Sequence, residues 1–338
     1  MILRLKPSPR HHATLPGATT GTPAVLVPTW LRRAVPDAQS LAGKDIDDVA
    51  LAAGAAIGAL DALVRRQERW AGAWRQRLAL SAAAVTTRHA GRVEDENALR
   101  DAVLLTRAGD DVGPAGSMLL AWRRLAVRPA EDLLTEASIA GVFDALGLAR
   151  DDETAADLVD ELPHLAATKG AVGTLVGVFA AVERRGLPRT VGSWFADALL
   201  AQRLGWTHAV PLFGGEAAGG NGSRKARRSG TAVVASVEDG NSQVKGLLAG
   251  QARAALRAID LSAELGRRAD RLLAVVPKLR AKAADVVVDK LLSDDAIVAS
   301  EKFAGMSDRG LRRLFDRLVE LGAVRELSGR PSFRIYGL

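Results

Sequence analysis

The chain has no cysteine and few aromatic residues. The absence of cysteine among its 338 residues excludes disulfide bonds and zinc sites built from thiolates. Aromatic residues make up 4% of the chain and hydrophobic residues 48%, so Ala and Leu supply most of the apolar mass. This balance favours packed helices over sheets, because Ala and Leu are strong helix formers.

Long apolar runs are also absent. No uninterrupted run approaches the roughly 18 residues that a membrane span needs. The first residues are basic and rich in proline, without the apolar core of a secretory signal. We therefore expect a soluble, cytoplasmic protein that has no contact with a membrane.

The motifs of the common cofactor and metal sites are missing. There is no phosphate-binding Walker loop and no glycine-rich dinucleotide motif between a strand and a helix. His89, His164 and His208 are single and far apart in the sequence, and no histidine pair has metal-site spacing. We expect neither a metal nor a cofactor.

Positive charge is concentrated at the C-terminal end. The net charge is +7. Residues 251–338 contain 17 Lys and Arg against 12 Asp and Glu, an excess of five, which leaves an excess of two for residues 1–250. An excess of cations favours binding to polyanions such as DNA through the release of counterions.

Apolar residues at helical spacing predict a mainly α protein. An N-terminal multi-helix domain is expected to precede a C-terminal winged helix-turn-helix with one small β-hairpin. The expected parts are an irregular N-terminal arm, a helical domain, a flexible Gly-rich basic loop, a long helical connector and the winged helix-turn-helix. They correspond to residues 1–43, 44–206, 207–230, 231–277 and 278–338.

The C-terminal segment has the pattern of a winged helix-turn-helix. A first helix is expected at residues 281–292 and a short second helix at 295–303. After a turn, Ser307 is placed to cap a third helix, because its hydroxyl can accept a hydrogen bond from a first-turn amide. Two strands, 324–327 and 332–336, would form the wing. Such a fold places its third helix in the major groove of DNA.

Cationic side chains gather on the third helix and the wing. Together with Ser307, they are the residues that we expect to contact double-stranded DNA: Ser307, Arg309, Arg312, Arg313, Arg317, Arg325, Arg330 and Arg334. Nearby acids such as Asp316 and Glu326 partly offset this charge, and some winged helices bind proteins instead of DNA.

A second group of charged residues lies in the helical domain, within residues 75–124. Ion pairs between helices are the simplest interpretation of these charges, and a ligand or anion site is the alternative. The candidate residues are Arg75, Arg77, Arg92, Glu94, Arg100 and Arg123.

Several segments resemble an uncharacterised alphaproteobacterial family, the domain-of-unknown-function family 1403. The resemblance rests on residues 74–80, 91–96, 113–116, 194–204, 272–282 and 307–338. It covers most of the chain beyond about residue 25 and implies a bacterial protein, often encoded on plasmids or other mobile replicons. It implies no catalytic residues.

Taken together, these patterns favour a DNA-binding protein, acting as a transcriptional regulator or as an accessory protein of a plasmid or mobile replicon. The helical domain would then mediate dimerisation, giving a homodimer, or sense a partner. The alternatives are an enzyme that uses the charged residues of the helical domain and a protein-interaction scaffold. The sequence favours a non-enzyme without deciding the question.

Overall fold

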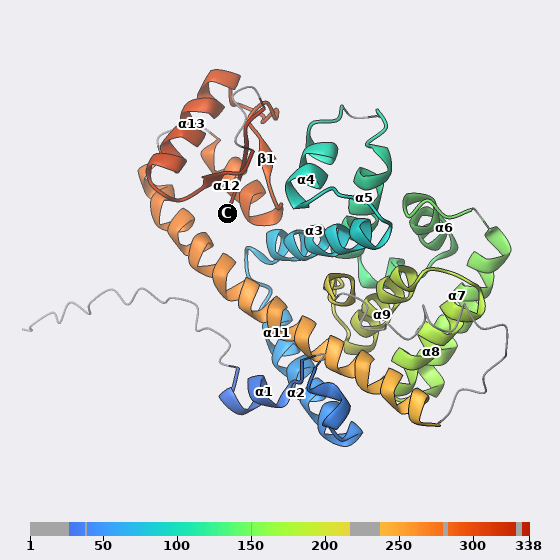
Figure 1. The fold of residues 1–338 in the computed structure, drawn as a ribbon. Coiled ribbons are helices and arrows are strands. Elements are labelled where there is room, and N and C mark those ends of the chain that lie inside the picture. The colour runs from blue at the N-terminus through green and yellow to red at the C-terminus, as the bar shows by residue number, and fades with distance from the viewer. Residues whose placement is uncertain are drawn as a thin grey trace, which may run out of the picture.

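The structure, a computed structural model, describes residues 27–37, 39–107, 109–149, 151–216, 237–279, 283–328 and 333–338. Helices dominate this part of the chain, as the composition predicts (Figure 1). The N-terminal helices are α1 (Thr29–Ala34), α2 (Ile46–Val64), α3 (Ala71–His89), α4 (Glu96–Leu104), α5 (Gly113–Val127), α6 (Glu136–Ala145), α7 (Asp152–Thr168), α8 (Ala171–Arg184) and α9 (Arg189–Leu204). We call residues 27–216 the helical body.

The body is built of helices, as the apolar spacing predicts for residues 44–206. The predicted arm was wrong in part, because residues 29–34 form α1 and its Leu31 is buried. Several helix starts follow from capping. The carboxylates of Asp45, Asp95 and Asp151 accept hydrogen bonds from first-turn amides of α2, α4 and α7.

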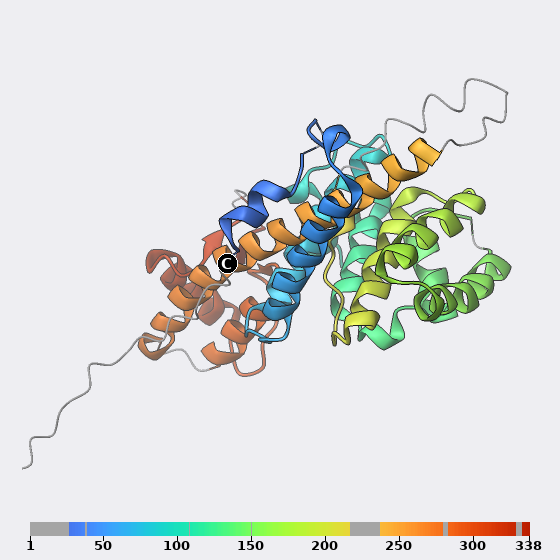
Figure 2. The same ribbon diagram turned by 90° about the horizontal axis from the view of Figure 1, so that it is seen from below.

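Helix α11 (Val237–Val275) is the long connector that was expected, and it runs along one side of the body. Figures 1 and 2 both show it crossing α2 and continuing to the C-terminal elements. The two helices pack through small residues, including Ala52 and Ala56 of α2 and Ala252 and Ala255 of α11, all at most 1% exposed. Small side chains let helix axes approach closely and bury a continuous apolar seam.

Residues 207–216 are packed against the helices of the body, including α9, although the sequence placed them in the flexible loop. Ala209, Val210, Leu212 and Phe213 are buried. Asp197 of α9 accepts hydrogen bonds from the Leu212 amide at 2.7 Å and the Phe213 amide at 3.1 Å. The rest of the expected loop, residues 217–230, lies outside the described residues.

Burial raises the pKa of Asp197 well above its ordinary value, and the two amides only partly counter this effect. The folded state therefore holds the proton more tightly than the unfolded state. The stability contributed by protonated Asp197 is fully present below the unfolded pKa of about 4 and is lost as pH rises from there through the folded pKa.

Replacing Asp197 with Asn removes this titration. We expect the stability difference, wild type minus Asp197→Asn, to shrink as pH rises from about 5 to 8, by at most about 1.4 kcal/mol per pH unit. Urea unfolding at several pH values measures it. Asp61→Asn is the control, because hydrogen bonds from Arg65 and Trp206 lower the pKa of Asp61. Parallel curves for wild type and Asp197→Asn would contradict the prediction.

The C-terminal elements form a small unit at one end of α11. They are α12 (Ala284–Ser293), β1 (Ile297–Val298), α13 (Asp308–Glu320), β2 (Arg325–Glu326) and β3 (Ile335–Gly337). The strands make a three-stranded antiparallel sheet in the order β1-β3-β2, with Ile297 opposite Tyr336 and Arg325 opposite Gly337. We call residues 283–338 the C-terminal unit.

The second helix of the predicted winged helix-turn-helix, at residues 295–303, is not formed. The helix-turn-helix prediction was therefore wrong at this helix. Ile297 and Val298 are β-branched residues that fit a pleated, half-buried sheet better than a short helix. They form β1 instead, and the Ala299 amide donates to the Arg334 carbonyl at 2.8 Å. The expected hairpin is therefore part of a three-stranded sheet.

Candidate nucleic-acid interface

Helix α13 begins where the sequence predicted. Ser307 caps it, with its hydroxyl accepting a hydrogen bond from the Gly310 amide at 3.1 Å. Its apolar face, Leu311, Leu314, Phe315 and Leu318, is at most 3% exposed. The buried face fixes the helix on the unit and leaves the opposite face in solvent.

An aromatic stack holds α13 against the sheet. The rings of Phe315 and Tyr336 lie 4.3 Å apart between centroids, with their planes 8° from parallel. Tyr336 belongs to β3, the central strand. The stack thus fixes the position of α13 relative to strands β2 and β3.

The solvent face of α13 carries four arginines, Arg309, Arg312, Arg313 and Arg317, and all four are exposed. Arg317 pairs with Glu320 at 2.7 Å. Within the described part of the chain, the other three form no ion pair. Three guanidinium groups without an ion pair thus lie at positions i, i+3 and i+4 on one side of a helix, although Arg312 is close enough to Asp308 to lower the pKa of that carboxyl.

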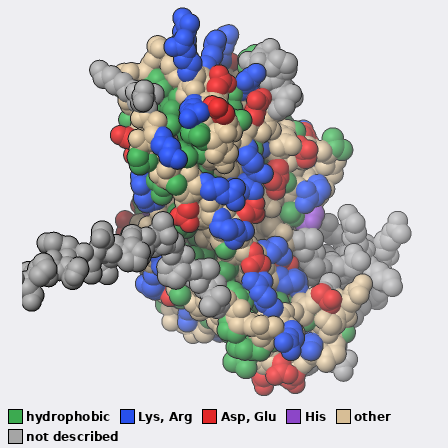
Figure 3. Space-filling model, turned by 90° about the vertical axis from the view of Figure 1, so that its left-hand side faces the viewer, with side chains coloured by type: hydrophobic (Ala, Val, Ile, Leu, Met, Phe, Trp, Pro, Cys, Tyr) green, Lys and Arg blue, Asp and Glu red, His purple; other side chains and the backbone are tan. Residues whose placement is uncertain are grey.

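The remaining predicted contacts lie beside this helix. Arg325 and Arg334 are exposed on or next to β2 and β3. Arg334 lies 3.7 Å from an Asp316 carboxylate oxygen and 3.9 Å from one of Glu326, so its charge is partly compensated. Arg330 lies outside the described residues. Figure 3 shows Lys and Arg side chains on this side of the molecule, from the C-terminal unit at the top downward, with Asp and Glu between them.

Beside the aromatic stack, a polar groove of about 400 Å³ lies between the exposed side of α13 and the sheet. Arg312 and Asp316 line it from the helix, and Phe333, Arg334 and Tyr336 line it from the strand side. Phe333 is an apolar side chain with 57% of its surface exposed. Phe333 has no signal in the sequence, because a lone aromatic residue beside a turn gives no pattern.

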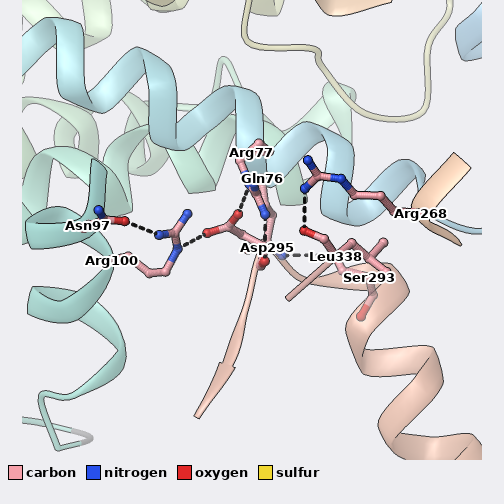
Figure 4. Close-up of polar contacts among 8 residues, drawn as sticks. All are labelled: Gln76, Arg77, Asn97, Arg100, Arg268, Ser293, Asp295 and Leu338. Carbon is pink, nitrogen blue, oxygen red and sulfur yellow. Dashed lines mark hydrogen bonds and ion pairs between the residues drawn. The ribbon is translucent and has the colours of Figure 1, made fainter. Parts of the chain in front are cut away.

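The second predicted cluster is only partly brought together. Arg77 of α3 and Arg100 of α4 both pair with Asp295, which precedes β1 in the C-terminal unit (Figure 4). The distance from Arg100 Nε to Asp295 Oδ2 is 2.7 Å. Arg123 of α5 also contributes to the electrostatic field at Asp295, and its Nε is buried without a hydrogen-bond partner. We call these four residues the Asp295 cluster.

Asp295 joins the C-terminal unit to the body. Burial alone would raise the pKa of Asp295, but the charges of Arg77 and Arg100 outweigh it and the pKa is lowered. Asp295 therefore stays ionised at neutral pH. Next to it, Gln76 Nε2 donates to Asp294 Oδ1 at 2.9 Å. Arg268 of α11 donates to the Leu338 carbonyl oxygen at 3.0 Å (Figure 4).

The other three members of the predicted cluster lie apart from Asp295. Arg92 pairs with Glu94, two residues away in the sequence. Arg75 donates from Nε to the Ala126 carbonyl oxygen at 2.9 Å and lines a separate cavity. In the described part of the chain, no group of three or more His, Asp or Glu residues could hold a metal ion. None of its helices is long and apolar enough to cross a membrane.

Comparison with known proteins gives one match. The family described as "Protein of unknown function (DUF1403)" matches residues 18–338. No curated protein and no solved structure matches the chain.

Proposed function

Because the chain belongs to the DUF1403 family, whose description assigns no activity, we propose a function from the geometry of this chain: its C-terminal unit binds double-stranded DNA through α13. The protein would act as a transcriptional regulator or as an accessory protein of a plasmid or mobile replicon. The observation that carries the proposal is the exposed row of uncompensated arginines, Arg309, Arg312 and Arg313, on a capped helix.

The order of elements in the C-terminal unit supports this proposal. The succession α12, β1, α13, β2, β3 is that of a winged helix without its second helix. In such folds the third helix enters the major groove and the hairpin lies over the backbone. A helix with side chains is about 10–12 Å across, and the major groove of B-DNA is about 12 Å wide.

The placement of α13 also fits the proposal. Figure 1 shows α13 on the outer side of the C-terminal unit, away from the helices of the body. Its arginines therefore face solvent and not a neighbouring helix. The body would contribute dimerisation or partner sensing, since operators commonly have two half-sites read by a dimer.

The test is binding to a labelled random-sequence duplex, followed by fluorescence anisotropy at several salt concentrations. If the three uncompensated arginines each neutralise a phosphate, the slope of log affinity against log salt should have a magnitude of about 3. No binding at low salt, or an affinity that does not change with salt, would contradict the proposal. In that case a protein-docking role for the C-terminal unit would be the better explanation.

A further inference from the structure

A cavity of about 560 Å³ is lined mostly by the helical body, and α11 and the C-terminal unit each add one residue to its wall. Its walls come from the end of α2, the start of α3 and residues 205–210. Ser262 of α11 and Ser293 of α12 complete them. Its volume is within the range of about 300–1,000 Å³ typical of sites for small molecules.

Three tryptophans line this cavity: Trp70, Trp74 and Trp206. The indole N–H groups of two of them are used within the fold. Trp74 donates to the Ala258 carbonyl at 2.9 Å, and Trp206 donates to Asp61 at 2.8 Å. The buried Nε1 of Trp70 has no hydrogen-bond partner. All three side chains are at most 5% exposed, so the indoles form a rigid apolar wall against which a planar apolar group can pack.

The charge of the cavity wall is uneven. Arg65 pairs with Asp61, Glu68 with Arg66, and Arg69 with Asp289. Within the described residues Arg75 has no carboxylate partner, and the Ala126 carbonyl is the one acceptor that it contacts. Burial lowers the pKa of Arg75 to about 10, so it remains cationic at neutral pH. A partly buried guanidinium with free N–H groups favours a carboxylate, which it can bind with two hydrogen bonds.

His208 stands on the same wall. Burial lowers its pKa, and the nearby positive charge of Arg75 lowers it further. The imidazole is therefore neutral at pH 7 and adds a polar group without a second charge.

We propose that this cavity binds a small, planar aromatic carboxylic acid, with its ring among Trp70, Trp74 and Trp206 and its carboxylate on Arg75. The wall also includes Ser293 of the C-terminal unit. The two parts already meet closely here, because a Cβ added to Gly72 would lie 2.5 Å from the Ser293 carbonyl oxygen. This proposal does not depend on DNA binding.

The experiment uses the full chain and 2-naphthoate as the probe, with its neutral analogue 2-naphthamide as the matched comparison. Isothermal titration calorimetry gives both affinities. We expect the acid to bind about ten- to a hundredfold more tightly than the amide, the range for a hydrogen bond to a charged group. Equal affinities, or no heat of binding from the acid at millimolar concentration, would overturn the proposal.

Variants locate the site. Arg75→Gln should abolish the preference for the acid, and Arg75→Lys should keep part of it because the charge remains. Arg65→Gln is the matched control, since Arg65 lines the same cavity but is already paired with Asp61. Thermal unfolding checks that each variant is folded. If Arg75→Gln does not fold, Arg75→Lys still tests the site. An Arg65→Gln variant that loses as much preference as Arg75→Gln would place the carboxylate elsewhere.

Discussion

Replacing Asp295 with Asn is expected to lower the free energy of unfolding by about 3–5 kcal/mol, the range for removing one partner from a buried ion pair. The Asp295 side chain is fully buried, and those of Arg77 and Arg100 are only 15% and 5% exposed. Without the carboxylate, two or three guanidinium groups would lie close together with no anion between them. Urea unfolding followed by circular dichroism measures the loss.

The neighbouring acid provides the control. Asp294 is 25% exposed and pairs with Lys290, so Asp294→Asn should cost no more than about 1 kcal/mol. The sign of the pH effect is a second check. Because the folded pKa of Asp295 is lowered, its contribution is present above the unfolded pKa of about 3.9 and is lost as pH falls through the folded pKa. Neutral surface substitutions change the free energy of unfolding by about 0.5 kcal/mol or less. If Asp295→Asn stays within that margin of wild type, the Asp295 cluster does not hold the C-terminal unit in place.

Replacing both Arg312 and Arg313 with Ala should weaken DNA binding on the order of 1–3 kcal/mol for each arginine that reads a base. If they contact only phosphates, affinity should fall alike for all sequences and the salt slope should decrease in magnitude by about 2. Both side chains are exposed and form no ion pair in the described part of the chain, so the fold should be unaffected. Anisotropy at several salt concentrations separates the two outcomes.

A basic chain can bind DNA without a defined interface, and the control has to exclude this. The double variant Arg88→Ala and Arg128→Ala removes the same charge from exposed positions of the helical body, near the end of α3 and after α5, where neither arginine forms an ion pair with a described residue. If α13 forms the interface, this pair should leave affinity nearly unchanged. An equal loss in both double variants would mean that net charge and not α13 determines binding.

The sequence predicts α13 and two of the three described strands, β2 and β3, but it misses β1. Helix α13 could be predicted because Ser307 is a strong cap and four apolar residues repeat at helical spacing. Strand β1 could not, because a two-residue strand has too few residues to show alternation. Its conformation depends on pairing with β3, almost forty residues later, which no local pattern records.

The sites show the same division between local and long-range information. The many arginines within residues 75–124 predicted a charged cluster there. The carboxylate that pairs with both Arg77 and Arg100, however, belongs to Asp295, far away in the sequence. Asp295 had no signal of its own beside Asp294, since a pair of acids after a helix usually faces solvent. The cavity beside Arg75 also escaped prediction, because its tryptophans come from two segments, the start of α3 and residue 206, that meet only in the folded chain.

The packing of α2 against α11 has a consequence during synthesis on the ribosome. Helix α2 begins at Ile46 and α11 at Val237, so about 190 residues separate the two halves of this seam. At about 5–20 residues per second, the apolar face of α2 waits roughly 10–40 s for its partner to emerge. During that interval Val49, Ala52 and Leu60, which are at most 1% exposed in the folded chain, have no α11 to cover them. The nascent chain therefore offers a binding surface for chaperones that the finished protein conceals.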